Sequence, residues 1–172
     1  MNCFTKVSSP LGLLTISSDG INVTGLWIEG QKYFADTLGK DTKEDDLPIF
    51  TQTKKWLDQY FTGQNPDFEL PLAPKGSPFR QQVWQILCTI PFGQVKTYGE
   101  IAKQIGKNMS AQAVGGAVGH NPISIIIPCH RVVGSDGSLT GYAGGLAKKI
   151  QLLKLEKAPV EKFYLPTKGT AL

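Results

Sequence analysis

Hydrophobic and polar positions follow a strand-like pattern in the first part of the chain. Three short β-prone runs, at 4–7, 13–17 and 21–28, are separated by turn residues at 9–12 and by Asp19-Gly20. An Asp-Gly pair between two such runs is typical of a β-hairpin. The pattern therefore predicts an antiparallel β-meander. Residues 68–70 predict one further strand, and the charged stretch 40–46 predicts a loop.

One helix and a linker complete this half. A helix ending near Gly63 is predicted by apolar side chains that recur at helical spacing, namely Phe50, Leu57, Tyr60 and Phe61. Prolines and a glycine within 71–78 mark the linker. We therefore expect an N-terminal α/β domain over residues 1–75.

From residue 77 onward the periodicity is helical. Ser77-Pro78 is a typical helix start. One buried stripe follows, formed by Phe79, Val83, Ile86 and Leu87. A helix-turn-helix is predicted next, with helices over 98–105 and 111–119 and with Ser110 as the cap of the second.

The second helix of that motif carries almost no side-chain bulk. Its small residues are Ala111, Ala113, Gly115, Gly116, Ala117 and Gly119. Each interior glycine destabilises a helix by about 1 kcal/mol relative to alanine. Close helix packing in the core explains this composition slightly better than the other interpretation, which is close approach of the backbone to DNA.

The end of the chain completes the expected fold. Segments 131–133 and 138–140 flank turn residues and predict a hairpin, which would be the wing of a winged helix. A Gly-rich loop at 141–145 leads into a last helix with Leu146, Ile150 and Leu153 facing inward, and 158–172 is expected to be a tail. The fold class expected is α/β (α+β), with a mainly helical winged helix-turn-helix domain over 76–157.

The segment Pro128-Cys129-His130-Arg131-Val132 places a thiol beside an imidazole. The apolar run 124–127 predicts a short buried strand that Pro128 ends. Cys129 would then lie where the core meets a cleft. A free cysteine is usually core packing, whereas a reactive one needs an activating environment. The pair alone leaves both interpretations open.

Composition narrows the function classes. No apolar run is long enough to span a membrane, and the N-terminus has no signal-peptide core, so we expect a cytoplasmic protein. We also expect it to be a monomer in solution. The three cysteines are expected to be free thiols. With two histidines and no Cys-x-x-Cys pair, neither a zinc site nor another cofactor is predicted.

Charge is distributed unevenly. Residues 76–157 hold nine Lys and Arg against three Asp and Glu, a net +6, whereas residues 1–75 carry a net −3. A basic domain suggests a polyanionic partner such as nucleic acid. A solvated basic surface explains the same charge about equally well.

A set of motifs runs in one order from about residue 77 to 157. It comprises Phe79…Val83-Trp84, Pro91-Phe92-Gly93…Thr97-Tyr98, Ala113-Val114-Gly115, Asn121-Pro122, Ile127-Pro128-Cys129-His130-Arg131-Val132, Gly141-Tyr142, Gly144-Gly145 and Leu152-Leu153…Glu156. In this set the chain resembles the methylated-DNA–protein-cysteine methyltransferases, also called O6-alkylguanine-DNA alkyltransferases. The first half resembles the family's more variable N-terminal domain weakly.

The resemblance implies DNA repair with double-stranded DNA as the partner. An alkylated guanine would be flipped out of the duplex, and its O6-alkyl group would pass irreversibly to Cys129, once per protein molecule. O4-alkylthymine is a second substrate that the resemblance allows. His130 would act as the base through a water, with Glu156 orienting it. Asn121 would be the hinge residue, and Tyr98 would give a proton to the departing guanine.

The resemblance also implies binding residues. Substrate contacts would come from Val132, Tyr142, Ala143 and Gly144. DNA contacts would come from Ser110, Ala111, Gln112, Ala113, Gly115, Gly119 and Arg131, although Arg131 equally fits a contact within the protein. Gln112 departs from the family, which usually has an arginine there to fill the gap left by the flipped base. Weaker DNA binding or base extrusion is expected from this change.

Three other function classes fit these residues less well. A non-reactive protein that recognises alkylated DNA would not need Cys129. A winged-helix transcription factor needs base-reading side chains, of which helix 111–119 offers only Gln112. A Cys-His hydrolase needs direct contact between thiol and imidazole, which adjacent residues on an extended chain do not easily make.

Overall fold

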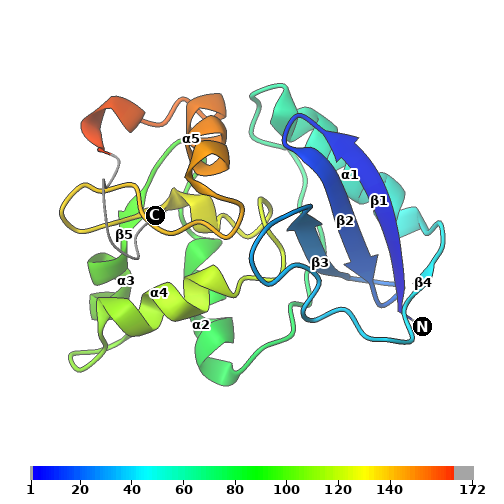
Figure 1. Cartoon of the computed structure of the whole chain (residues 1–172), viewed down its shortest axis with the longest axis horizontal. Coiled ribbons are helices and arrows are strands. Elements are labelled where there is room, and N and C mark those ends of the chain that lie inside the picture. Colours follow the sequence, from blue (N-terminus) through cyan, green and yellow to red (C-terminus); the bar gives the residue numbers. More distant parts are fainter. Residues whose placement is uncertain (1, 165–172) are drawn as a thin grey trace. The chain divides into compact units, whose positions relative to one another are not determined.

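The computed structural model describes residues 2–164, which form two compact units (Figure 1). The first comprises residues up to Lys75 together with Pro122–Ser124, and the second comprises the remaining described residues. The boundary near residue 75 was expected from the sequence, but the place of residues 122–124 in the first unit was not. This segment joins it because Leu26 N–H donates to Pro122 O at 2.8 Å and Ser124 N–H donates to Leu26 O at 2.9 Å.

The first unit contains the predicted meander. Strands β1 (Cys3–Ser9), β2 (Gly12–Ser18) and β3 (Val23–Ile28) are antiparallel, and the sheet order is β3-β2-β1-β4. Leu14 pairs with Ile28 and Ile16 with Leu26, and all four side chains are buried. The charged stretch 40–46 is not entirely a loop, because β4 (Lys43–Glu44) pairs with β1. Both β4 residues are exposed, and charged side chains suit an edge strand.

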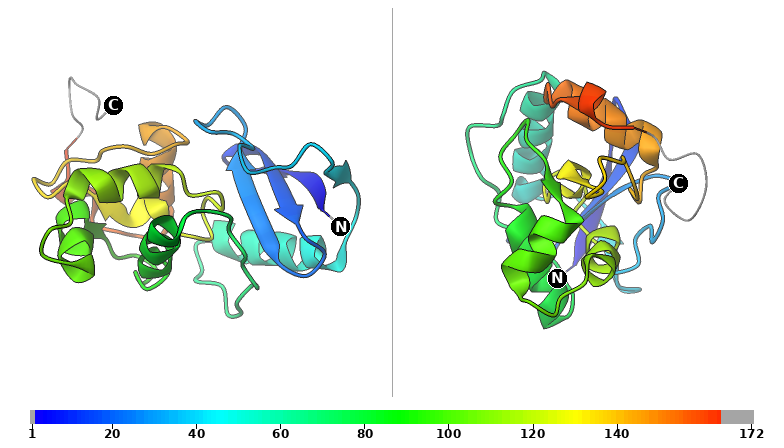
Figure 2. Two further views of the ribbon diagram at one scale, coloured as in Figure 1. Left: turned by 90° about the horizontal axis from the view of Figure 1, so that it is seen from below. Right: turned by 90° about the vertical axis from the view of Figure 1, so that its left-hand side faces the viewer.

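Helix α1 (Pro48–Phe61) lies along this sheet, as Figure 2 shows, and buries Ile49, Phe50, Leu57 and Tyr60. Gly63 adopts φ +89° and its N–H donates to Tyr60 O, as its predicted place at the helix end requires. The strand predicted at 68–70 is wrong. Pairing with β3 occurs instead at Leu72, which forms an isolated bridge with Val23. Val23 N–H donates to Pro71 O, and Ala73 N–H donates to Val23 O.

The second unit contains the predicted helix-turn-helix. Its helices are α2 (Pro78–Leu87), α3 (Tyr98–Ile105), α4 (Ala111–Gly119) and α5 (Leu146–Leu155). Side chains of Ser77, Thr97 and Ser110 cap the first three. The indole of Trp84 donates to Ala117 O at 2.9 Å, so small residues on α4 permit close packing on one face. None of the helices within residues 2–164 is long and apolar enough to cross a membrane.

The buried strand predicted at 124–127 is wrong. Ile123 forms an isolated bridge with Leu26, and the chain then turns at Ile125, whose φ is +73°. The side chain of Asn121 donates to Ile127 O at 2.8 Å and holds this turn. Ile125 and Ile127 are buried as expected and Ile126 is half-buried, but these residues occupy a tight turn.

The hairpin wing is also wrong. Strand β6 (Val132–Val133) pairs in parallel with β5 (Lys96–Thr97), and Ser138 pairs with Tyr164. The partner of 137–139 is thus the segment predicted to be an unstructured tail. That segment contains the short helix η2 (Val160–Lys162), and Phe163 packs against the buried cluster of Val133, Leu139, Leu153 and Ala158. The rest of the predicted tail, 165–172, lies outside the described residues.

Candidate active site

Cys129 begins the short 3₁₀ helix η1 (Cys129–Arg131) and is 4% exposed. The turn at Ile125 and the amide of Asn121 place it there, because the same Asn121 side chain bonds Ile127 O and the Cys129 sulfur. Burial raises the pKa of the thiol. The hydrogen bond from Asn121 and the positive charge of Lys149 act in the opposite direction.

Lys149 is a site residue that the sequence analysis missed. It is fully buried, and its Nζ donates to Val132 O at 2.5 Å and to Thr140 O at 2.6 Å. Burial lowers its pKa to about 8, while the Cys129 charge acts to raise it. One signal was available: Lys149 occupies the predicted apolar stripe of α5 with Leu146, Ile150 and Leu153. A lysine on such a stripe needs partners in the interior.

His130 and Glu156 meet as the resemblance implied. The imidazole Nε2 lies 2.6 Å from Glu156 Oε2, and both side chains are inaccessible. Burial lowers the pKa of His130, against the raising effect of Glu156. For Glu156, burial acts to raise the pKa, but hydrogen bonds and charge from His130 and Arg131 outweigh it and hold the pKa at about 2.

The Arg131 side chain is nearly buried and bound within the second unit, so its position gives no support to its predicted place among the DNA contacts. Its side chain is 11% exposed, with Nε donating to Glu156 Oε1 at 2.8 Å and Nη2 to Glu156 Oε2 at 3.1 Å. Nη1 donates to Ile90 O at 2.7 Å. The contact within the protein, which its place in the motif equally fitted, is the one that the structure forms.

Tyr98 lies at the start of α3 and reaches the loop after β6. Its hydroxyl is 3.2 Å from Thr140 O and 3.4 Å from Gly141 O. Burial and, to a smaller extent, the Cys129 charge raise its pKa to about 12, against the lowering effect of the hydrogen bond with Thr140. Its ring passes α4 at Gly115, where an added Cβ would lie 3.9 Å from two ring carbons. The phenol therefore keeps its proton at neutral pH.

The predicted substrate loop lies beside this cluster. Tyr142 is buried with its ring edge-to-face to His130, at 6.4 Å between centroids. Ala143 and Gly144 form a half-buried turn that Gly145 N–H closes onto Tyr142 O at 2.9 Å. Val132 is also a predicted substrate contact; its carbonyl oxygen already accepts from Lys149 and has one remaining lone pair.

The candidate DNA contacts are on α4 and at its cap. Ser110, Ala111, Gln112 and Ala113 are exposed, whereas Gly115 and Gly119 are half-buried.

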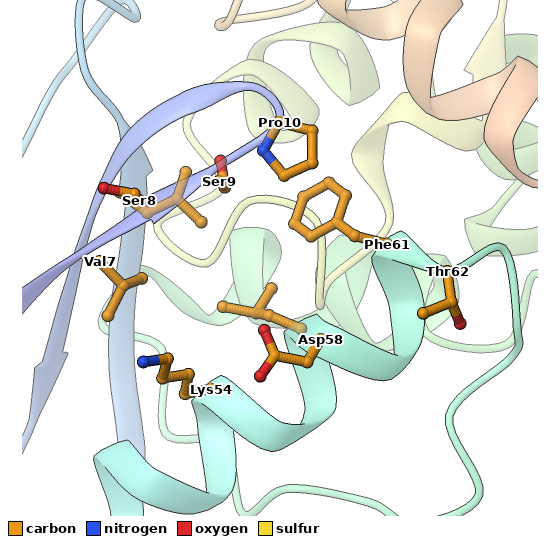
Figure 3. Close-up of a pocket in the computed structure, with 10 residues that line it drawn as sticks. Val7, Ser8, Ser9, Pro10, Lys54, Asp58, Phe61 and Thr62 are labelled. Carbon is orange, nitrogen blue, oxygen red and sulfur yellow. The ribbon is translucent and has the colours of Figure 1, made fainter.

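A separate cavity of about 250 Å³ lies in the first unit between the β1–β2 turn and α1, with Lys54, Asp58 and Phe61 on its wall (Figure 3). None of the candidate site residues lines it.

Acid is expected to destabilise the protein through the His130–Glu156 pair. Glu156 has a folded pKa of about 2 against an ordinary 4.5, so the stability it contributes is present above pH 4.5 and is lost as the pH falls toward 2. This loss amounts to roughly 3 kcal/mol. His130 is held neutral, so stability also falls below its ordinary value of 6.5, where the unfolded chain takes up a proton.

Urea unfolding between pH 7 and pH 3 measures this effect. The midpoint should fall with pH in the natural chain and fall less below pH 4.5 in Glu156→Gln. An equally steep fall in both proteins would contradict the assignment of acid sensitivity to Glu156.

Comparisons with known proteins cover nearly the whole chain. The 6-O-methylguanine DNA methyltransferase DNA binding domain matches residues 78–158, and the ribonuclease-like domain of the same family matches residues 2–74. A methylated-DNA–protein-cysteine methyltransferase of Haemophilus influenzae is 46% identical over 91% of this chain and 87% of its own. One from Mycobacterium bovis is 43% identical over 90% of this chain and 92% of its own.

Solved structures agree with these sequence relatives. A crystal structure of Mycobacterium tuberculosis OGT in complex with DNA has a TM-score of 0.82 and 40% identity over 93% of this chain and 98% of that one. A structure of the M. tuberculosis O6-methylguanine methyltransferase has a TM-score of 0.80 and 43% identity, covering 91% and 93%. The chain belongs to the 6-O-methylguanine DNA methyltransferase family.

Proposed function

We propose that this protein repairs alkylated DNA directly, by moving the alkyl group from guanine O6 to the sulfur of Cys129. The observation that carries the proposal is the surroundings of the thiol. Cys129 is buried, receives a hydrogen bond from Asn121 and lies within the field of the Lys149 ammonium. Burial raises the pKa of the thiol, but the hydrogen bond from Asn121 and the Lys149 charge both stabilise the thiolate, and core packing needs neither group.

The transfer is a displacement at carbon. A lone pair of the Cys129 sulfur forms the new carbon–sulfur bond while the bond between O6 and the alkyl carbon breaks, and its electrons leave with guanine. Tyr98 supplies the proton that the leaving guanine needs, which its raised pKa of about 12 keeps in place until then. The product is an intact guanine and a thioether on Cys129.

The thiol proton must be removed for this step. Glu156 is ionised, so it accepts from a proton on His130 Nε2 and leaves the lone pair of the neutral ring on Nδ1. Nδ1 is then the nitrogen that takes the thiol proton through a water. Lys149 lowers the free energy of the resulting thiolate through its charge. Asn121 positions the sulfur through its hydrogen bonds.

The protein acts once. A thioether sulfur carries no proton and is a poor leaving group, so the product does not regenerate the thiol. The alternative of a non-reactive protein for alkylated DNA is not favoured, because relatives at 43–46% identity are named methyltransferases and the nucleophile is present. The free thiols at Cys3, Cys88 and Cys129 suit the reducing cytoplasm, where we place the protein.

DNA binds along α4, which presents exposed small residues to the duplex. Short side chains let a helix backbone approach phosphates closely, and such contacts are independent of base sequence. Base extrusion exposes O6 of the alkylated guanine for the reaction. The loop with Tyr142, Ala143 and Gly144 then receives the base beside Cys129.

Gln112→Arg is expected to tighten binding to duplex DNA about three- to tenfold at 0.1 M salt, because it adds one positive charge at the exposed start of α4. Fluorescence anisotropy with an unmodified duplex measures the affinity. Gln85→Arg adds the same charge to an exposed site on α2 and serves as the control. Unchanged or weaker binding by Gln112→Arg would contradict the placement of Gln112 against DNA.

A titration tests the proposed function. Increasing protein is added to a fixed amount of duplex with one O6-methylguanine, and the remaining lesion is counted after digestion. The lesion should fall linearly to zero at one protein per lesion. Either no loss of lesion or repair of several lesions per protein molecule would overturn the proposal.

A further inference from the structure

Arg131 is fixed by three separate parts of the second unit. Its guanidinium binds both carboxylate oxygens of Glu156, at 2.8 and 3.1 Å, and the carbonyl of Ile90 at 2.7 Å. Its carbon centre also lies 5.8 Å from the centroid of the Phe92 ring. A solvent-exposed cation does not need this many directed contacts. The contacts therefore hold the Arg131 guanidinium in one position.

The Glu156 carboxylate is held from several directions. Arg131 supplies a two-pronged contact, His130 supplies a third hydrogen bond, and Gly93 N–H donates to Oε1 at 3.0 Å. Gly93 has φ +81°, and an added Cβ would lie 2.9 Å from Glu156 O, so this close approach needs glycine. A two-pronged arginine contact fixes the carboxylate plane as well as its position.

The His130 ring can act as a base only while it is neutral, so the charges around it decide whether it can take the thiol proton. An ionised carboxylate 2.6 Å from an imidazole favours the protonated ring, and a protonated ring cannot accept the thiol proton. Glu156 comes from the end of α5, Lys149 from its interior, Arg131 from η1 and the Tyr142 ring from the loop after β6. Burial lowers the pKa of His130, the Glu156 contact raises it, and the charges of Arg131 and Lys149 lower it.

We infer that Arg131 is a positioning residue of the alkyl-transfer site, because its guanidinium fixes Glu156 against His130 and offsets the carboxylate charge, so that the imidazole stays oriented and neutral. This inference rests on the proposed function only for the use of His130 as a base. It explains why an arginine that follows the reactive Cys-His pair faces the interior and does not face DNA.

The state of His130 is measured first, without DNA. The chain has two histidines, so nitrogen-15 NMR of the imidazoles gives a simple titration, and His120→Gln assigns the signals. Arg131→Met keeps the length and apolar stem but removes the charge. His130 should remain neutral to lower pH in the natural chain than in Arg131→Met. An identical His130 titration in the two proteins would overturn the inference.

The transfer rate gives the second readout. At saturating duplex, the rate of Arg131→Met divided by that of the natural chain should be about one tenth at pH 7 and should rise as the pH is raised, because a proton on His130 is then lost. Dividing the two rates cancels the pH dependence that comes from ionisation of the Cys129 thiol, because both proteins contain this thiol. A ratio that is constant between pH 6 and pH 9 would show a merely structural role and overturn the inference.

Arg131→Lys keeps the inference testable if the methionine variant does not fold. It retains the charge but not the fork, so His130 should titrate as in the natural chain while transfer slows at every pH. Transfer at the natural rate would overturn the positioning role. Absence of transfer in the natural chain would instead overturn the proposed function, and the NMR titration would still report on Arg131.

Discussion

Cys129→Ser is expected to abolish alkyl transfer and to leave binding to unmodified duplex intact. A hydroxyl ionises far less readily than a thiol, so the imidazole of His130 cannot convert it into a useful nucleophile. The loss should exceed about 10³-fold in the single-turnover rate. Serine has the shape of cysteine with a smaller terminal atom, and its buried hydroxyl can keep the hydrogen bond with Asn121, so the fold should tolerate the change.

Lesion loss under single-turnover conditions measures this effect. Cys88→Ser is the matched control, because Cys88 is an exposed free thiol at the end of α2. It should transfer at the natural rate. Residual transfer in Cys129→Ser above a hundredth of the natural rate, or loss of transfer in Cys88→Ser, would contradict the choice of nucleophile.

Lys149→Met should slow transfer about ten- to a hundredfold at pH 7. The charge of the buried ammonium lowers the pKa of the Cys129 thiol, so removing it raises that pKa and makes the thiolate less favourable. Methionine fills a similar volume, but Val132 O and Thr140 O each lose a hydrogen bond. These carbonyls belong to the two segments that flank the acceptor site, so their positions will also loosen.

Alkylation of Cys129 by iodoacetamide separates the two effects, because it requires the thiolate and no DNA. The pH at which alkylation becomes half-maximal should shift upward in Lys149→Met. Lys154→Met, at an exposed position on the same helix, should leave that pH unchanged. An unshifted value in Lys149→Met would leave Lys149 without an electrostatic role on the thiol.

Elements with a local chemical signal were predictable from the sequence. Helices α2 and α4 begin at the residues that Ser77-Pro78 and Ser110 indicate, and the meander follows its Asp-Gly turn. The meeting of His130 with Glu156 came from the family resemblance, since the two are 26 positions apart and no local pattern links them.

Elements that depend on distant partners were not predictable. The run 124–127 has the composition of a strand, but β3 takes up the backbone at 122–124 and forces a turn at Ile125. Residues 138–140 were expected to pair with 131–133, yet Leu139 N–H donates to Tyr164 O and Tyr164 N–H donates to Gly137 O. The resemblance implied a DNA contact for Arg131, and no local pattern links this arginine to its carboxylate partner Glu156, 25 positions later.

Intact-protein mass after reaction with a duplex that contains one O6-methylguanine tests the central claim most directly. The prediction is a gain of about 14 Da, one CH₂, on no more than one site per chain, with peptide mapping to Cys129. An unchanged mass with the duplex still bound, or a gain that maps to Cys3 or Cys88, would contradict alkyl transfer to Cys129.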